Sequence, residues 1–339
     1  MIQSHFLPFN VKRNSFEFVA IKIPLLLILA WVAGTQFFGI SKDYDQYLNF
    51  FDEVRSSNSY FKITTRFEPA FTFLSYVLTR SFVSNSWIYG FFVFLALVLK
   101  AAGLIGKQNN LKYFVIFFVF YLVRYFPLYE LTQLRVAVSL SIVFFVYLQK
   151  TNDQRDWRDI GLLILAVLFH YSSAVIFLIY FVRKINRLHV VFAFFAVLAA
   201  GVALKQTVLA ILPSFFIVFR VYNEVGFGEV KASLISSTIA IDLFLIIIAF
   251  IFWEKNNHTM KVSILFLAIG LAIYWGFMDL PLIAHRFKEL TSVFALVYVM
   301  HSFKSGYRSM HQFSYAMFII NISTHTYLNY VRNPLIVNS

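Results

Sequence analysis

The segment FPLYELTQLRVAVSLSIVFF, residues 126–145, is long and apolar enough to enter a membrane, yet it carries polar side chains near its start. These are Glu130, Gln133 and Arg135. An arginine at the centre of a membrane-spanning helix costs about 2.5–3.5 kcal/mol on insertion scales. A compensating interaction is therefore required, and ionisable residues in such segments are candidates for function.

The composition indicates that most of the chain lies in lipid. Of 339 residues, 60% are hydrophobic, 43 are Phe and only 13% are charged, whereas soluble domains are roughly 45–50% apolar and about 25% charged. The net charge of +13 is attributed to basic side chains that flank spans and face membrane lipids with anionic headgroups. No nucleic-acid partner is expected. The chain has no cysteine, so disulfides and thiolate chemistry are excluded.

Apolar runs between polar segments predict an all-α polytopic membrane protein with roughly ten to twelve transmembrane helices. We expect a single transmembrane domain over residues 1–339. Its first span is residues 23–40, and Lys12, Arg13 and Lys22 precede or begin it. Basic residues favour the cytoplasmic side, so this span should run outward.

Residues 41–86 are expected to form a periplasmic loop that carries an interfacial helix at 70–82. Were that helix to cross, Lys100, Lys107 and Lys112 would lie outside, against the positive-inside rule. The remaining spans are then expected within 87–330, at 87–105, 113–129, 131–149, 160–182, 188–204, 206–221, 234–253, 262–279, 282–302 and 312–330. This scheme places the C-terminus outside.

The run 160–182 permits a second topology. If it crosses once, Arg183, Lys184 and Arg187 lie on the outer side. If it folds as two half-helices and 206–221 lies at the interface, these basic residues become cytoplasmic. The sequence leaves both schemes open.

Ionisable residues at or near membrane depth form four groups, and all but one fall on the outer side of the predicted spans. One of them has a helical pattern, since Thr132, Arg135 and Ser139 lie at i, i+3 and i+7 on one face. The groups are Asp43 and Asp45 with Glu68; Arg135 with Glu130; His170 within its run; and Asp279, His285 and Arg286 around Pro281.

Structural roles for the arginines remain open alternatives. Arg135 could pair with Glu130, and Arg286 could pair with Glu289 one helical turn away. Arg124 is expected to extend its side chain to the membrane surface, and no functional role is assigned to it.

Together these four groups of ionisable residues provide the side chains needed to transfer a glycan from a pyrophosphate carrier. Guanidinium groups such as those of Arg135 and Arg286 bind pyrophosphate through two oxygens and stay charged. His170 or a carboxylate can accept the proton of a sugar hydroxyl. In the alternative interpretation, His170 is a hydrogen-bonded core histidine, and Asp43 and Asp45 belong to a solvated loop.

Several short motifs occur in an order that resembles a known family. They are DYDQY (43–47), FEPAF (67–71), LTQLRVAVSL (131–140), LFHYSSAVIF (168–177), RVYNE (220–224) and HRFKEL (285–290). Over roughly residues 40–300 they resemble the EpsG-like branch of bacterial Wzy polymerases, which join O-antigen or exopolysaccharide repeat units. The resemblance implies a multi-pass glycosyltransferase of the GT-C kind in the inner membrane, with its active site facing the periplasm.

The resemblance also implies site residues: Arg135, His170 and Arg286 match family positions, and Asp43, Asp45 and Glu68 lie where such folds carry acidic residues. These six are the catalytic candidates. The substrate-binding candidates, taken from the polar residues and motifs above, are Glu130, Gln133, Arg220, Tyr222, Asp279 and His285. Asp43 and Asp45 could hold Mg²⁺. Paired arginines make a metal unnecessary, so neither a metal nor another cofactor is expected.

The predicted activity transfers a growing glycan from undecaprenyl pyrophosphate to the non-reducing end of a lipid-linked oligosaccharide repeat unit. Expected partners are this lipid-linked oligosaccharide, membrane lipids, a chain-length regulator and a flippase. A flippase function for the chain itself is disfavoured because the sequence has no internal repeat. An O-antigen ligase-like enzyme or a membrane acyltransferase is a further alternative, but His258, His301 and His311 are scattered singly.

Overall fold

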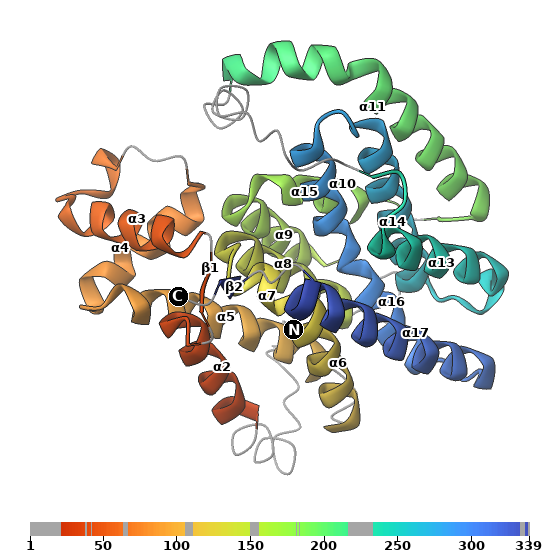
Figure 1. The fold of residues 1–339 in the computed structure, drawn as a ribbon, viewed down its shortest axis with the longest axis horizontal. Helices are drawn as coiled ribbons and strands as arrows, with labels where there is room; N and C mark the ends of the chain where they lie inside the picture. Colours follow the sequence, from red (N-terminus) through yellow and green to blue (C-terminus); the bar gives the residue numbers. More distant parts are fainter. Residues whose placement is uncertain are drawn as a thin grey trace, which may run out of the picture.

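The computed structural model describes residues 22–37, 39–41, 43–63, 67–105, 111–149, 156–180, 182, 184–215, 233–332 and 336–337. The regular secondary structure of these residues is helical apart from one pair of two-residue strands, as Figure 1 shows. The helices are α2 Ile23–Thr35, α3 Tyr44–Ser56, α4 Pro69–Ser81, α5 Asn85–Ile105, α6 Leu111–Arg124, α7 Phe126–Tyr129, α8 Leu134–Gln149, α9 Trp157–Phe169, α10 Ala174–Tyr180, α11 Arg187–Phe215, α13 Ser237–Ile251, α14 His258–Gly276, α15 Pro281–Ser292, α16 Phe294–Phe303 and α17 Arg308–Thr326. Short 3-10 turns are η2 Tyr60–Lys62, η3 Tyr171–Ser173 and η4 Trp253–Lys255, η5 Tyr327–Arg332 is a π-helical turn, and the strands are β1 Ile40–Ser41 and β2 Ile336–Val337.

The predicted all-helical class is confirmed for the described residues, and their apolar helices are consistent with a membrane protein. Among the described residues, α5, α11 and α14 contain segments long and apolar enough to cross a membrane. Three shorter apolar helices accompany them, at Ile23–Thr35, Leu134–Leu148 and Ser237–Ile251. The total number of spans, the single-domain boundaries and the GT-C architecture stay predictions.

Two predicted segment boundaries are wrong. The runs 188–204 and 206–221 were expected as separate spans, but a continuous helix of 29 residues, α11, covers Arg187–Phe215. The run 282–302 is instead divided at Val293, where α15 ends and α16 begins. The helix expected at 70–82 is present as α4.

Contacts between elements define two ends of the bundle. At one end, the Tyr113 hydroxyl donates to the carbonyl of Phe303 at 3.3 Å, and Arg187 lies 3.5 Å from Glu254. At the other end, β1 pairs with β2, which brings the described C-terminal residues beside the end of α2. The Arg187 contact supports the two-half-helix topology, because it places Arg187 at the same end as the loop that contains Glu254.

Glycines allow close approach of neighbouring helices. A Cβ atom on Gly34 of α2 would lie 2.6 Å from the carbonyl oxygen of Ser86 in α5. A Cβ on Gly201 of α11 would lie 3.0 Å from the Cα of Gly276 in α14. Small residues at helix crossings permit the backbone contacts that stabilise helix pairs in lipid.

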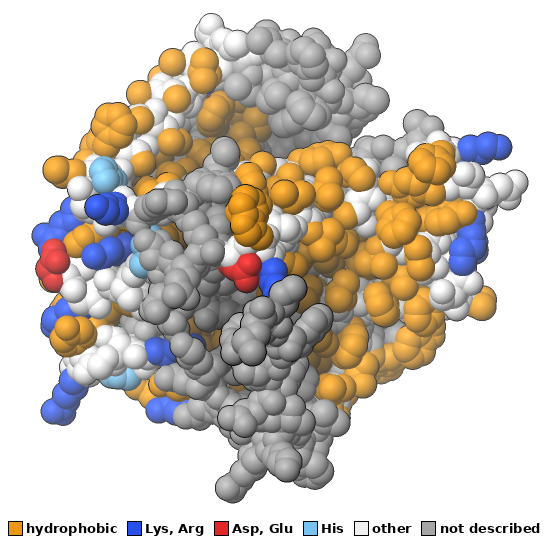
Figure 2. All heavy atoms as spheres, turned by 180° about the vertical axis from the view of Figure 1, so that it is seen from behind, with side chains coloured by type: hydrophobic (Ala, Val, Ile, Leu, Met, Phe, Trp, Pro, Cys, Tyr) orange, Lys and Arg blue, Asp and Glu red, His pale blue; other side chains and the backbone are white. Residues whose placement is uncertain are grey.

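The outer surface is apolar over a wide area. Helix α11 runs along the outside of the molecule (Figure 1) and exposes Leu188, Phe192 and Phe195, at 75%, 75% and 60% of their surface. Figure 2 shows a broad hydrophobic face, with most of its Lys and Arg side chains gathered along one edge. This pattern fits a lipid-facing belt with a basic border.

A buried ion pair joins α5 to the turn before α8. Lys100 and Glu130 are fully buried, with Nζ 2.7 Å from Oε1. The Tyr121 hydroxyl also contacts the carboxylate, at 2.6 Å from Oε2, and Lys100 contacts the hydroxyl of Ser141 at 2.5 Å. Two interpretations from the sequence are therefore wrong: Lys100 does not lie at the bundle's end, and the partner of Glu130 is not Arg135.

Breaking this pair should lower stability strongly. Lys100→Met leaves the Glu130 carboxylate buried without its cation, which typically costs ~3–5 kcal/mol. Lys100→Met combined with Glu130→Gln should recover much of that loss, because no buried charge remains. Thermal unfolding of the purified protein in detergent measures both changes, with the exposed Lys62→Met as control. Equal melting of Lys100→Met and the control would contradict this account.

Candidate functional site

The centre of the candidate site is a break in the apolar run at His170. Helix α9 ends at Phe169, and His170 has an extended backbone with φ −158° and ψ 111° before η3 begins. Ser139 of α8 fixes this break, since its hydroxyl donates to the carbonyl of Ala166 at 2.8 Å and lies 2.6 Å from the Ser173 hydroxyl. The histidine therefore occupies a non-helical position held in place by a neighbouring helix.

Glu68 joins the first loop to this break. It precedes α4, whose first residue is Pro69, and it caps no backbone amide. Its Oε1 accepts a hydrogen bond from Nδ1 of His170 at 3.0 Å, and its Oε2 accepts one from Nη1 of Arg135 at 2.5 Å. One carboxylate thus holds a guanidinium and an imidazole together from segments far apart in the sequence.

The exposure of the three side chains differs. The Glu68 side chain is 5% exposed, whereas Arg135 is 25% and His170 is 19% exposed. The carboxylate therefore forms the buried base of the cluster, and parts of the guanidinium and of the imidazole remain accessible. An anion or a hydroxyl could approach them without displacing Glu68.

Aromatic rings support the guanidinium. Arg135 lies over the ring of Phe67, 4.5 Å from its centroid, and Phe67 stacks on Tyr47 of α3 with centroids 5.8 Å apart. The Nε of Arg135 is buried and has no hydrogen-bond partner within the part of the chain that the structure describes. This stacking orients the planar group and favours its cationic form.

The environment keeps Glu68 ionised. Burial opposes the charged form, but the hydrogen bond from His170 and the positive charge of Arg135 outweigh it, so the pKa of Glu68 lies below its ordinary value. The cluster is therefore a cation–carboxylate–imidazole arrangement with the negative charge in the middle.

Arg286 lies on a helix next to the cluster of Glu68, Arg135 and His170. It is an exposed residue of α15, and this helix packs against η3 directly after His170. No ion pair links it to Glu289 among the described residues, in contrast to the structural alternative considered from the sequence. The sequence grouped Glu68 with Asp43 and Asp45, whereas the structure pairs it with Arg135 and His170.

Among the described residues, no hydrogen bond or ion pair joins the other acidic candidates to Glu68, Arg135 or His170. Asp43 and Asp45 begin α3, where Asp45 is exposed and Asp43 half-buried. Asp279 pairs with Lys205 at 2.5 Å near the surface. Within the described ranges, no three His, Asp or Glu side chains gather as a metal site would require.

The remaining substrate-binding candidates have varied environments. Glu130 is occupied by Lys100 and Tyr121, so we do not retain it as a substrate contact. Gln133 is buried in the turn before α8. Arg220 and Tyr222 lie outside the described residues.

Sequence reasoning missed a second buried charge cluster and misjudged Arg124. Arg124 is 4% exposed and is not a surface residue. Its guanidinium lies 2.8 Å from Asp242 and 2.5 Å from the amide oxygen of Asn321, and Lys288 also lies 3.2 Å from Asp242. The sequence does indicate this cluster, because Asp242 is a single carboxylate within the apolar run STIAIDLFLIII, residues 237–248. A carboxylate within such a run requires a partner.

The family assignment agrees with the motifs that surround this site. The EpsG family model matches residues 19–335, nearly the whole chain. The chain belongs to the EpsG family. No curated protein and no solved structure matches it, so the geometry of this EpsG-family site is interpreted from its own residues.

The Glu68 bridge should make stability depend on pH. A carboxyl whose pKa is lowered on folding stabilises the protein above its ordinary pKa of 4.5, and the contribution is lost as the pH falls through the lower folded value. Glu68→Gln has no such ionisation. Below pH 4.5 the melting temperature in detergent should therefore fall more steeply for the unsubstituted protein than for Glu68→Gln. Parallel curves would show that Glu68 is not selectively stabilised as a carboxylate.

Proposed function

We propose that this EpsG-family protein is an exopolysaccharide polymerase that transfers a growing glycan from undecaprenyl pyrophosphate to a lipid-linked repeat unit. The observation that carries the proposal is the bridge of Glu68 between Arg135 and His170. Family membership supports the polysaccharide class. The bridge supports group transfer, since it holds an anion-binding group beside a proton acceptor.

The arginines would bind the carrier. Arg135 keeps its charge at accessible pH, and its accessible edge can bind phosphate oxygens as the C–O bond to the pyrophosphate breaks. Arg286 adds a second positive charge from the side of α15. The leaving undecaprenyl pyrophosphate takes the electron pair of that bond, and the guanidinium groups stabilise its added negative charge.

His170 would act as the general base. Its Nδ1–H donates to Glu68, which leaves Nε2 as the proton acceptor. The acceptor hydroxyl oxygen attacks the anomeric carbon of the donor sugar, and its proton passes to Nε2. Glu68 orients the imidazole and stabilises the imidazolium that forms, as a buried carboxylate does in a catalytic triad.

The distribution of basic residues supports a periplasmic site. The end opposite the site carries many cationic residues and few acidic ones. The described cationic residues there include Lys22, Lys112, Arg158, Lys184, Arg187, Lys255, Lys261, Lys304 and Arg308, and the acidic ones include Asp156, Asp159 and Glu254. By the positive-inside rule this end faces the cytoplasm, and the site faces the opposite side of the inner membrane.

Cysteine labelling tests this sidedness, because the chain has no native cysteine. In spheroplasts, an impermeant maleimide should react with Asp45→Cys at the site end. Glu254→Cys at the opposite end should react only after the membrane is disrupted. The Glu254 side chain is 83% exposed, so absence of labelling would reflect the membrane barrier. Labelling of Glu254→Cys in intact spheroplasts would reverse the orientation.

Deletion of the gene followed by complementation tests the activity. The deletion strain should accumulate a single-repeat band on gels of surface polysaccharide, and the unsubstituted gene should restore the ladder. Arg135→Lys keeps the charge but loses the planar fork, so the rate should fall roughly 10²–10³-fold at a normal protein level.

The exposed Arg158→Lys is the matched control and should restore the ladder fully. An unchanged ladder in the deletion strain would contradict the polymerase function. A full ladder with Arg135→Lys would contradict the role of its guanidinium in binding pyrophosphate.

A further inference from the structure

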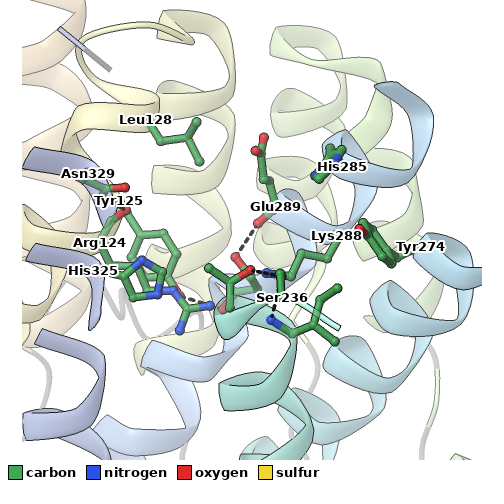
Figure 3. Close-up of a pocket in the computed structure, with 13 residues that line it drawn as sticks. Arg124, Tyr125, Leu128, Ser236, Tyr274, His285, Lys288, Glu289, His325 and Asn329 are labelled. Atoms are coloured by element: carbon green, nitrogen blue, oxygen red, sulfur yellow. Dashed lines mark hydrogen bonds between the residues drawn. The ribbon is translucent and has the colours of Figure 1, made fainter. Parts of the chain in front are cut away.

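A cavity separate from the Glu68 cluster lies beside α15. Its volume is about 160 Å³, and residues of α6, α7, α13, α14, α15 and α17 contribute to its lining (Figure 3). His285 and Glu289 face it from α15, Tyr274 from α14, Thr238 from α13 and His325 from α17.

Its charges are balanced. Arg124 and Lys288 share the Asp242 carboxylate, at 2.8 and 3.2 Å, and Glu289 adds a second negative charge at the cavity wall. Two cationic side chains thus face two carboxylates. A pyrophosphate would need surplus positive charge, whereas a neutral polar molecule needs only hydrogen-bonding partners to offset its desolvation.

Unused hydrogen-bonding groups line the cavity. The Nε2 atoms of His285 and His325 are buried and have no partner within the described part of the chain, and His325 is only 6% exposed. The Glu289 backbone carbonyl accepts from the Tyr129 hydroxyl at 2.7 Å, but none of the described residues bonds its carboxylate. Buried polar atoms are normally satisfied, so these atoms indicate a missing polar partner.

An aromatic wall adds a surface of the kind that sugar rings contact. The Tyr274 ring meets His285 edge to face, with centroids 5.3 Å apart, and its hydroxyl is held by the Ser233 carbonyl at 3.0 Å. Figure 3 shows His285 and His325 on opposite sides of the space, with Glu289 between them. A ring bearing several hydroxyl groups can donate to the carboxylate and bond both imidazoles at once.

We propose that this cavity binds a neutral sugar of the acceptor glycan, with Glu289, His285 and His325 as its hydrogen-bonding partners. The inference rests on the proposed polymerase function, which supplies a glycan as substrate. Helix α15, which carries His285 and Glu289, also packs against η3 directly after His170, so α15 connects the cavity to the site of group transfer. A sugar held here would anchor the acceptor while its reacting hydroxyl reaches His170.

Protection of an introduced cysteine tests this inference. Thr238→Cys lines the cavity, and the adjacent Ser237→Cys is exposed but outside it. The probe is the repeat-unit oligosaccharide released by mild acid from lipid-linked units of the deletion strain. With protein in nanodiscs and oligosaccharide at about ten times its Kd, a methanethiosulfonate reagent should modify Thr238→Cys roughly tenfold more slowly. Ser237→Cys should react at an unchanged rate.

Two further variants identify the site. Glu289→Gln in the Thr238→Cys background should abolish the protection, and Arg135→Lys should preserve it. The inference is overturned if Thr238→Cys is unreactive, if it is not protected, if Ser237→Cys is protected equally, or if Glu289→Gln leaves protection intact. An unchanged polysaccharide ladder after gene deletion would instead refute the polymerase function, so the two failures are distinguishable.

Discussion

A charge buried in an apolar bundle must have a partner of opposite charge, because an isolated buried ion costs several kcal/mol. This constraint organises the described structure. Glu68 joins the first loop to the break after α9, Glu130 joins α5 to the turn before α8, and Asp242 joins α13 to α6 and α15. Each carboxylate connects segments that are distant in the sequence.

The three pairings differ in their access to solvent, and this difference separates structure from function. Lys100 and Glu130 are fully enclosed, so their pair is out of reach of a substrate. Glu68 is nearly as shielded, but Arg135 and His170 retain exposed edges. A buried carboxylate that presents two accessible partners is suited to orient them toward a substrate.

The sequence allowed part of this to be predicted. The helical class followed from composition, and Arg135, His170 and Glu68 were selected because ionisable residues are costly at membrane depth. The ion-pair partners of these residues could not be predicted, because sequence periodicity shows which residues share a face of one helix but not which helices pack together. Arg135 therefore had a local candidate in Glu130, whereas its observed partner is 67 positions away.

The same limit explains the errors with Arg124 and Lys100. Each lies near the end of an apolar run, where a long basic side chain normally reaches the membrane surface. Only tertiary packing shows that Asp242 and Glu130 hold these side chains inside. The sequence permits a break at His170 but does not require one, because the break depends on Ser139, a residue of another helix.

The central claim is that Glu68 acts on group transfer through His170. A double-mutant cycle with Glu68→Gln and His170→Gln tests it directly, using the polymerisation rate of purified enzyme with lipid-linked repeat units. If Glu68 orients the base, each single variant should be slow and the double variant should be no slower than His170→Gln alone. Rate losses that multiply in the double variant, or an unimpaired Glu68→Gln enzyme, would contradict the account.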